Sequence, residues 1–254
     1  MNPTAAPSRK AVLFDLDDTL FDHQHARRAA LAMLQRSHAP LAGRSIRELE
    51  VLHERHLQAT FELLAVRKLD LAESRRERMR LLFADHGVEL APDSAARAEA
   101  FYRRAYDVAR RAVTGVEWLI PALLQCGVKL AVVTNGFAIE QQEKLRLCGL
   151  SAAFRAVVLG GDLGLSKPDP AIFRRALAAL EVGVDEAVVI GDSWSLDVQG
   201  ARNAGIAAVW FNRCGDPHPE AHLEGAARVP MLTGLAPLET ALSLLLSPGV
   251  RTRA

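Results

Sequence analysis

Short apolar runs recur along this chain, each bounded by polar or turn residues, which is the pattern of buried β-strands. Six runs are expected to form strands, the last being the weakest: Ala11–Phe14, Val128–Val133, Ala156–Leu159, Ala187–Ile190, Ala207–Phe211 and Arg228–Leu232. Helical stretches separate the later runs, at Ile139–Cys148, Pro170–Leu180 and Ser195–Ala204. This alternation predicts an α/β fold with a doubly wound parallel sheet and helices on both faces.

The segment from about His23 to Val113 breaks the alternation. It contains no convincing strand and is rich in Ala, Leu, Arg and Glu, with apolar residues at helical spacing. Breaks near Ala39-Pro40, Leu69-Asp70 and Leu90-Ala91-Pro92 divide it into four expected helices. The sequence therefore predicts a sheet domain of residues 1–22 and 114–254, interrupted by an all-α domain of residues 23–113.

Composition narrows the class of protein. Half of the 254 residues are hydrophobic and the formal net charge is +1, so we expect a sizeable core and no nucleic acid polymer or membrane as partner. Met1–Lys10 lacks the apolar region of a signal peptide, and Ser247–Ala254 is expected to fray. Cys126, Cys148 and Cys214 match neither a disulfide framework nor a zinc pattern. We interpret them as reduced thiols of a cytoplasmic protein.

Two carboxylates, Asp15 and Asp17, directly follow the first predicted strand and are separated by one residue. They stand at the carboxyl end of that strand, where ligand crevices lie in open α/β sheets. Holding two like charges together is costly unless a cation or a proton lies between them. The pair therefore favours a metal site or acid–base chemistry over a purely structural role.

Polar groups follow the other predicted strands as well. Thr134-Asn135-Gly136 could donate hydrogen bonds to phosphoryl oxygens, although the same triplet is also typical of an ordinary turn. Lys167 precedes a helix for which Asp169 is the expected N-cap, but a lone loop lysine is usually a solvated charge. Asp192 follows a buried strand, and Asp197 either joins the site or merely complements the dipole of the next helix.

These groups would converge on one edge of the sheet. Carboxylate oxygens are hard ligands that suit Mg²⁺, which also binds waters and a substrate phosphate. No His or Cys cluster in the sequence competes for a transition metal. Neither a Walker-type loop nor a GxGxxG follows the first strand, so a nucleotide-binding loop of those kinds is not expected.

In their order along the chain, these motifs resemble the haloacid dehalogenase (HAD) superfamily of aspartate-nucleophile phosphotransferases. The matching residues are Asp15-Leu16-Asp17-Asp18-Thr19, Thr134-Asn135, Lys167, and Gly191-Asp192 with Asp197. The resemblance covers about residues 10–21 and 114–212, and the helical insertion looks like that family's α-helical cap. A finer resemblance, to 5′-nucleotidases and N-acylneuraminate-9-phosphatases, rests on Thr134-Asn135-Gly136-Phe137 followed by Gln141-Gln142-Glu143-Lys144-Leu145.

The resemblance implies a Mg²⁺-dependent phosphatase that hydrolyses a small phosphate monoester, such as a nucleoside 5′-monophosphate or a sugar phosphate, through an aspartyl-phosphate. The resemblance implies three sets of residues. Asp15 (nucleophile), Asp17 (general acid and base) and Lys167 would carry catalysis, and Thr134, Asn135 and Lys167 would bind the phosphate. Asp15, Asp192 and the backbone carbonyl of Asp17 would bind the metal, and Asp197 would either bind it through water or orient Lys167.

Alternatives remain open at this point. The dehalogenases of the superfamily lack an acid at the position of Asp17, so its presence favours phosphate ester hydrolysis. A phosphomutase of the same superfamily would return the phosphoryl group to its substrate, and a non-catalytic regulatory protein would only bind a phosphate ligand. The protein is expected to be a monomer or homodimer. The four residues His23, His25, Arg27 and Arg28 either contact substrate or form an ordinary polar helix start.

Overall fold

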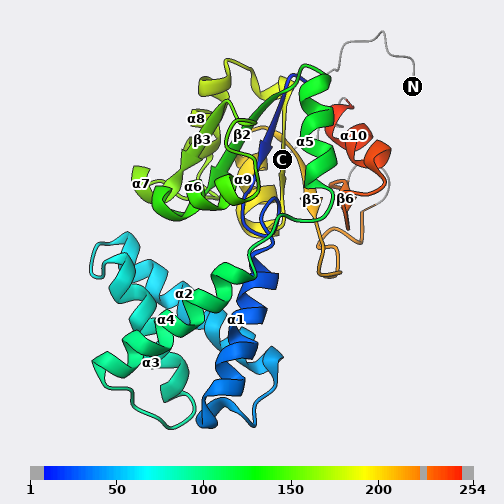
Figure 1. Ribbon diagram of the computed structural model, residues 1–254. Coiled ribbons are helices and arrows are strands. Elements are labelled where there is room, and N and C mark those ends of the chain that lie inside the picture. The colour runs from blue at the N-terminus through cyan, green and yellow to red at the C-terminus, as the bar shows by residue number, and fades with distance from the viewer. Residues whose placement is uncertain (1–8, 224–227, 248–254) are drawn as a thin grey trace. The chain divides into compact units, whose positions relative to one another are not determined.

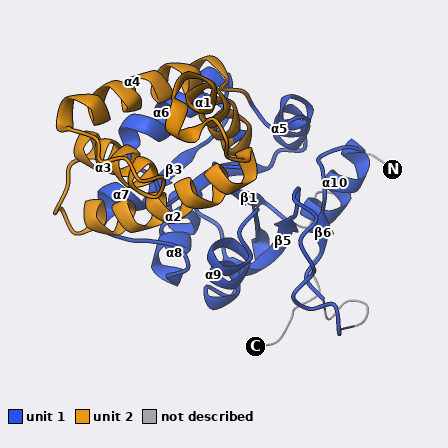
Figure 2. Cartoon of the chain, turned by 90° about the horizontal axis from the view of Figure 1, so that it is seen from below, with its two compact units in different colours: residues 1–22, 112–254 blue, residues 23–111 orange. Residues whose placement is uncertain are grey.

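The computed structural model describes residues 9–223 and 228–247, and the chain divides into two compact units (Figure 1 and Figure 2). Unit 1 comprises residues 1–22 and 112–254, and unit 2 comprises residues 23–111. The predictions made for Met1–Lys10 and Ser247–Ala254 fall almost entirely outside the described residues.

Unit 1 contains a six-stranded parallel sheet in the order β3-β2-β1-β4-β5-β6, which confirms the predicted fold class (Figure 1). The strands are β1 Ala11–Phe14, β2 Lys129–Thr134, β3 Ala156–Leu159, β4 Ala187–Gly191, β5 Ala207–Phe211 and β6 Met231–Leu232. The first five agree with the predicted strands to within one residue at each end. The sixth is shorter than the predicted Arg228–Leu232 and keeps only its last two residues.

Helices cover both faces of this sheet. They are α5 Val116–Gln125, α6 Ala138–Leu147, α7 Gly160–Leu163, α8 Pro170–Leu180, α9 Gln199–Asn203 and α10 Leu238–Leu246, with short turns η2 Val184–Glu186 and η3 Trp194–Val198. Figure 2 shows α8 and α9 on one side of the sheet and α5 with α10 on the other. The helix predicted over Ser195–Ala204 is divided, because η3 is a π-helical turn that leads into α9. Helices α5 and α10 were not among the predicted elements.

The core of unit 1 follows the strand pleat, in which alternate side chains point to opposite faces. The strand residues that pack toward α8 and α9 are Ala11, Leu13, Ala131, Val133, Ala187 and Val189. Phe173 of α8 is fully buried against them. Burying one such side chain contributes about 1.5–3 kcal/mol. This packed layer therefore holds the strands, and the polar residues that follow them, in fixed positions.

Unit 2 consists of four α-helices and one short 3₁₀ turn: α1 His23–Ser37, η1 Ala39–Leu41, α2 Ile46–Ala65, α3 Leu71–Ala84 and α4 Pro92–Val108. The helix breaks fall where the sequence predicts them. Asp70 forms a capping box with Glu73 at the start of α3, and Pro92 occupies the first turn of α4. None of the helices in the described ranges is both long and apolar enough to cross a membrane.

The chain leaves and re-enters unit 1 at one point. Val113 N–H donates to the Leu20 carbonyl over 2.9 Å, and Phe21 forms an antiparallel bridge with Ala112. The two connecting segments are therefore paired with each other inside unit 1, on either side of the inserted helices.

Candidate active site

The candidate site begins at the carboxyl ends of three adjacent strands, β2, β1 and β4. Strand β1 lies between the other two, and the chain continues to β2 on one side and, later, to β4 on the other. This is the switch point at which open α/β sheets form ligand crevices. Asp15 directly follows β1, Thr134 ends β2, and Asp192 follows β4. Asp15 N–H donates to the Ile190 carbonyl over 2.9 Å, which ties the loop that begins at Asp15 to β4.

Lys167 lies between two buried carboxylates. Its Nζ is 2.5 Å from Asp15 Oδ1 and 2.7 Å from Asp197 Oδ1, and all three residues are at most 6% exposed. Burial opposes the charge of Lys167, but the two carboxylates outweigh it and raise the pKa of the lysine above its usual value. Burial raises the pKa of Asp15 to about 7 even though Lys167 opposes the shift. The lysine is therefore a permanent cation beside the predicted nucleophile.

Asn135 holds the backbone of Lys167 in place. Its Oδ1 accepts from Lys167 N–H over 2.7 Å, and its Nδ2 donates to the Lys167 carbonyl over 3.3 Å. Asp169 caps α8 as predicted, through the Ala171 N–H at 2.8 Å. The sequence did not indicate the contact between Asn135 and Lys167, because the two residues belong to separate loops. Phosphate binding by Asn135 stays a prediction.

Three carboxylates gather beside Lys167. Oxygen atoms of Asp15, Asp192 and Asp197 lie within 4.8 Å of one another. Both oxygens of Asp197 already accept hydrogen bonds, one from Lys167 and the other from Ser193 N–H at 3.0 Å. Gly191 makes room for this arrangement, because a Cβ atom there would overlap the Asp197 carboxylate. Asp197 therefore already has a donor at each of its oxygens, and its role beside a metal stays a prediction.

The carboxylate cluster has the chemistry of a site for a hard divalent cation. Burial raises the pKa of Asp192 to about 9, and the charges of Asp15 and Asp197 add to the shift. A metal ion of charge +2 relieves this repulsion, and an all-oxygen donor set suits Mg²⁺. The residues present therefore fit the predicted metal.

The side chain of Asp17 has its own partners. Lys144 Nζ lies 2.6 Å and 2.8 Å from its two carboxylate oxygens, and Gln141 Nε2 donates to Oδ2 over 2.9 Å. The same amide nitrogen donates to Thr134 Oγ1 over 2.9 Å. Sequence reasoning missed Gln141 and Lys144 as site residues. The available signal was a pair of polar residues three positions apart on one turn of a predicted helix.

Backbone hydrogen bonds within the loop that joins Asp15 to the insertion hold that loop together. Asp18 has a positive φ of 63° and its N–H donates to the Phe21 carbonyl over 2.7 Å. Phe21 N–H and Leu20 N–H both donate to the Leu16 carbonyl. These hydrogen bonds hold the backbone of the turn that follows Asp15 and contains Asp17.

The four polar residues at the start of α1 belong to unit 2. His23 Nδ1 lies 2.7 Å from the Tyr106 hydroxyl, and Arg27 forms an ion pair with Glu54. The exposed Arg28 lies 3.7 Å from the partly buried Glu50, and His25 is partly buried. These contacts are compatible with an ordinary polar helix start, and a role in substrate binding stays a prediction.

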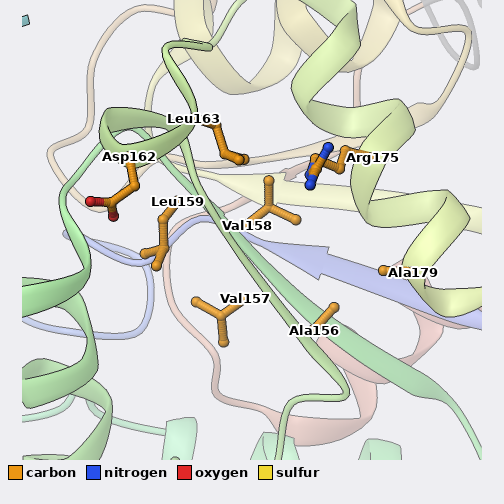
Figure 3. A pocket seen from close by; sticks show the side chains of 8 residues that line it. All are labelled: Ala156, Val157, Val158, Leu159, Asp162, Leu163, Arg175 and Ala179. Atoms are coloured by element: carbon orange, nitrogen blue, oxygen red, sulfur yellow. The ribbon is translucent and has the colours of Figure 1, made fainter.

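A cavity of about 350 Å³ lies away from these groups, along edge strand β3 (Figure 3). Its lining residues are Ala156, Val157, Val158, Leu159, Asp162, Leu163, Arg175 and Ala179. None of the predicted catalytic, phosphate-binding or metal-binding residues is among them. We therefore place the candidate chemistry at the strand ends and not in this cavity.

Comparison with known proteins shows which family this chain resembles. Residues 9–205 match the model of a hydrolase family described as haloacid dehalogenase-like hydrolase. Phosphoserine phosphatase of Thermus thermophilus is 42% identical over 127 residues, about half of each chain, since the alignment spans 49% of both. Pyrimidine 5′-nucleotidase PynA of Streptococcus pneumoniae is 30% identical over 85% of this chain and 86% of its own.

Two further matches concern the finer resemblance and the fold. N-acylneuraminate-9-phosphatase of Mus musculus is 39% identical over 35% of this chain and 36% of its own, so both proteins of the branch indicated by the sequence are relatives. The crystal structure of the HAD-hydrolase YfnB from Bacillus subtilis, bound to magnesium, is similar with a TM-score of 0.71 at 24% identity, covering 92% of this chain and 99% of that one. The predicted family resemblance is confirmed.

Proposed function

Because the chain belongs to the haloacid dehalogenase-like hydrolase family, we propose that it is a Mg²⁺-dependent phosphatase for small phosphate monoesters that forms an aspartyl-phosphate on Asp15. One observation carries the proposal: a buried lysine and two further carboxylates surround Asp15 at the carboxyl end of β1. Relatives named as phosphatases and a nucleotidase support the reaction class.

The first step transfers the phosphoryl group to the enzyme. An oxygen of Asp15 forms a bond to phosphorus while the bond from phosphorus to the ester oxygen breaks. Asp17 gives its proton to the departing oxygen, so the product leaves as an alcohol. Lys167 offsets the negative charge that would otherwise keep a carboxylate away from a phosphate dianion.

The second step releases phosphate. Water attacks phosphorus, the bond to Asp15 breaks, and Asp17 takes the proton that the water loses. Thr134 and Asn135 would donate hydrogen bonds to the phosphoryl oxygens. When bound by Asp15, Asp192 and the Asp17 carbonyl, Mg²⁺ would supply positive charge to the phosphoryl group and reduce its repulsion from Asp15. Asp197 orients Lys167 through the 2.7 Å contact.

The two units have separate parts in this proposal. All the proposed catalytic residues belong to the core domain, residues 1–22 and 114–254, while residues 23–113 would form the helical cap domain. We expect the substrate to be a nucleoside 5′-monophosphate or a sugar phosphate. A cytoplasmic location is supported by three free cysteines. A monomeric or homodimeric state stays a prediction.

The decisive experiment is a phosphate-release assay over nucleotides, sugar phosphates, phosphoserine, phosphoglycolate and an acylneuraminate phosphate, with Mg²⁺ or with EDTA. We expect Mg²⁺-dependent release of inorganic phosphate from at least one ester. Transfer of the phosphoryl group to a second position of the substrate, without free phosphate, would identify a phosphomutase. Binding without turnover would identify a regulatory protein, and release that is equal in EDTA would overturn the metal requirement.

A further inference from the structure

The carboxylate of Asp17 accepts three hydrogen bonds from two side chains on a single turn of α6. Lys144 contacts both oxygens, at 2.6 Å and 2.8 Å, and Gln141 contacts one of them at 2.9 Å. Residues three positions apart on a helix lie on the same face, so one rigid element delivers both side chains. The acid–base group of the proposed reaction is therefore held from one direction by fixed donors.

Gln141 also joins Asp17 to the phosphate-binding side of the site. Its Nε2 donates to Thr134 Oγ1 as well, over 2.9 Å, and an amide nitrogen has two hydrogens for two acceptors. Gly136 permits this placement, because a Cβ atom at that position would overlap the Gln141 side chain. The hydroxyl of Thr134 and the carboxylate of Asp17 thus share one donor group.

Burying the polar side chains of Gln141 and Lys144 costs free energy of folding. Gln141 is 2% exposed and its Oε1 has no hydrogen-bond partner. An unsatisfied buried acceptor costs about 1–3 kcal/mol. Lys144 is 8% exposed, and its ammonium also lies 5.4 Å from the centre of the Phe21 ring. An apolar helix face would cover the strand ends without these penalties, which indicates that the donors serve the site.

Cys148, at the end of the same helix, does not compete for the lysine. Burial raises the pKa of its thiol to about 11, and the charge of Asp17 adds to the shift. A thiol with that pKa is uncharged at neutral pH. The anion that Lys144 contacts is therefore the Asp17 carboxylate.

We propose that Lys144 and Gln141 are positioning residues that hold the Asp17 carboxylate in register with Thr134 for proton transfer. This inference rests on the proposed phosphatase function and concerns Asp17 alone. Without the ammonium, the carboxylate can adopt other rotamers, and each step in which Asp17 moves a proton becomes slower. Attack by Asp15 on a substrate with a good leaving group needs no such proton.

The alternative is an ion pair that only stabilises the fold. Replacing such a pair is often neutral or even stabilising, and its loss lowers all activities together through the folded fraction. If Lys144 positions Asp17, its loss slows the steps in which Asp17 transfers a proton and leaves the other steps unchanged. The leaving-group dependence of the phosphoryl-transfer step, read as a burst in the pre-steady state, therefore distinguishes the two accounts.

The test compares Lys144→Met with Arg146→Met. Arg146 lies on the same helix in an exposed pair with Glu143 and has no place in the site, so it is the matched control. Both variants are assayed on p-nitrophenyl phosphate and on the best alkyl phosphate of the substrate panel. For Lys144→Met we expect kcat on the alkyl ester to fall about 10–100-fold, with KM within about threefold of the parent. The Arg146 variant should match the parent on both esters.

Pre-steady-state kinetics supply a second readout. With p-nitrophenyl phosphate, the Lys144→Met variant should release a burst of nitrophenol and then turn over slowly, because hydrolysis of the aspartyl-phosphate still needs Asp17 as a base. In Lys144→Ala, added ethylamine should restore part of the rate, whereas tetramethylammonium, which has no N–H, should not. Gln141→Leu should show the same leaving-group dependence with a smaller loss.

Equal losses on both esters without a burst would overturn the proposal and leave a structural ion pair. An active parent with an unchanged Lys144→Met variant would do the same while preserving the proposed function. If the parent itself lacks phosphatase activity, crystal structures of the parent and of Lys144→Met still decide whether the Asp17 carboxylate loses its orientation. An unchanged carboxylate in that comparison would contradict the inference.

Discussion

Asp15 and Asp17 stand two residues apart, yet each has its own lysine and its own surroundings. Lys167 comes from the loop before α8 and serves two carboxylates, and all three side chains are at most 8% exposed. Lys144 comes from α6 and pairs with one carboxylate, that of Asp17, whose side chain is 31% exposed. The first group holds more negative than positive charge, whereas the second is balanced.

This difference teaches how one short segment can provide two kinds of carboxylate. Burial, with the neighbouring carboxylate charges adding to it, raises the pKa of Asp15 to about 7 and that of Asp192 to about 9, so a cation bound there would relieve the cost of charging both groups. The Asp17 carboxylate already has a cation, the Lys144 ammonium, at both of its oxygens. Substitutions on the two sides should therefore fail in different ways.

The largest effect is expected from Asp15→Asn and Asp17→Asn. Loss of the nucleophile should lower turnover of any ester by about 10⁴-fold or more, with no covalent intermediate. Loss of the acid–base group should be comparably severe in steady state. Quenched-flow assays with p-nitrophenyl phosphate should show a nitrophenol burst only for Asp17→Asn.

Circular dichroism of both variants should match the parent, which controls for folding. Turnover within about tenfold of the parent in Asp15→Asn would sink the nucleophile assignment. Rapid phosphate release by Asp17→Asn would remove that residue from proton transfer.

A second comparison sets Lys167→Met against Lys144→Met in stability. Removing Lys167 leaves two buried carboxylates uncompensated, and breaking a buried pair costs about 3–5 kcal/mol. Removing Lys144 exposes a single, partly solvated carboxylate, so its cost should be smaller. Urea unfolding in EDTA measures both, and equal midpoints for the two variants would contradict the division of the site.

The smallest effect concerns pH and Asp192. Its pKa in the fold, about 9, lies above that of an unfolded chain, so the metal-free fold holds a proton that the unfolded chain has lost. The stability of the metal-free protein should therefore fall as pH rises from about 4 to about 9. Asp192→Asn removes this loss, and its melting temperature in EDTA should exceed that of the parent by a few degrees near pH 8.

The difference between Asp192→Asn and the parent should vanish near pH 4, where both side chains are uncharged. Added Mg²⁺ should raise the melting temperature of the parent and not that of the variant. A variant that is less stable than the parent at every pH would show that Asp192 acts as an ordinary structural carboxylate.

Local signals in the sequence predicted the sheet and the strand-end motifs. Apolar runs gave five of the strands, and Asp70, Pro92 and Asp169 marked helix starts, because each depends on neighbours within a few residues. Helix α5 escaped prediction since its sequence is nearly all apolar and includes Pro121, a residue type that usually interrupts a helix.

The contacts that the sequence did not predict join residues far apart in the chain. Asn135 reaches Lys167, and Lys144 reaches Asp17 across more than a hundred positions. Their residue types are ordinary for a turn and for a helix surface, and the local pattern does not reveal which distant residue each one contacts. The order of the parallel strands, which places β2 between β1 and β3, brings these groups together.

The pairing of Leu20 with Val113 and of Phe21 with Ala112 has a consequence for how such a protein can diversify. Because the two ends of the insertion meet on the sheet unit, everything between them can lengthen, shrink or be exchanged without shifting the register of β1 against its neighbours. Natural selection can then alter the inserted helices as one block while the predicted catalytic residues at the strand ends stay unchanged. Replacing the residues that lie between Phe21 and Ala112 by the corresponding segment of a relative is thus the shortest route to a hybrid enzyme.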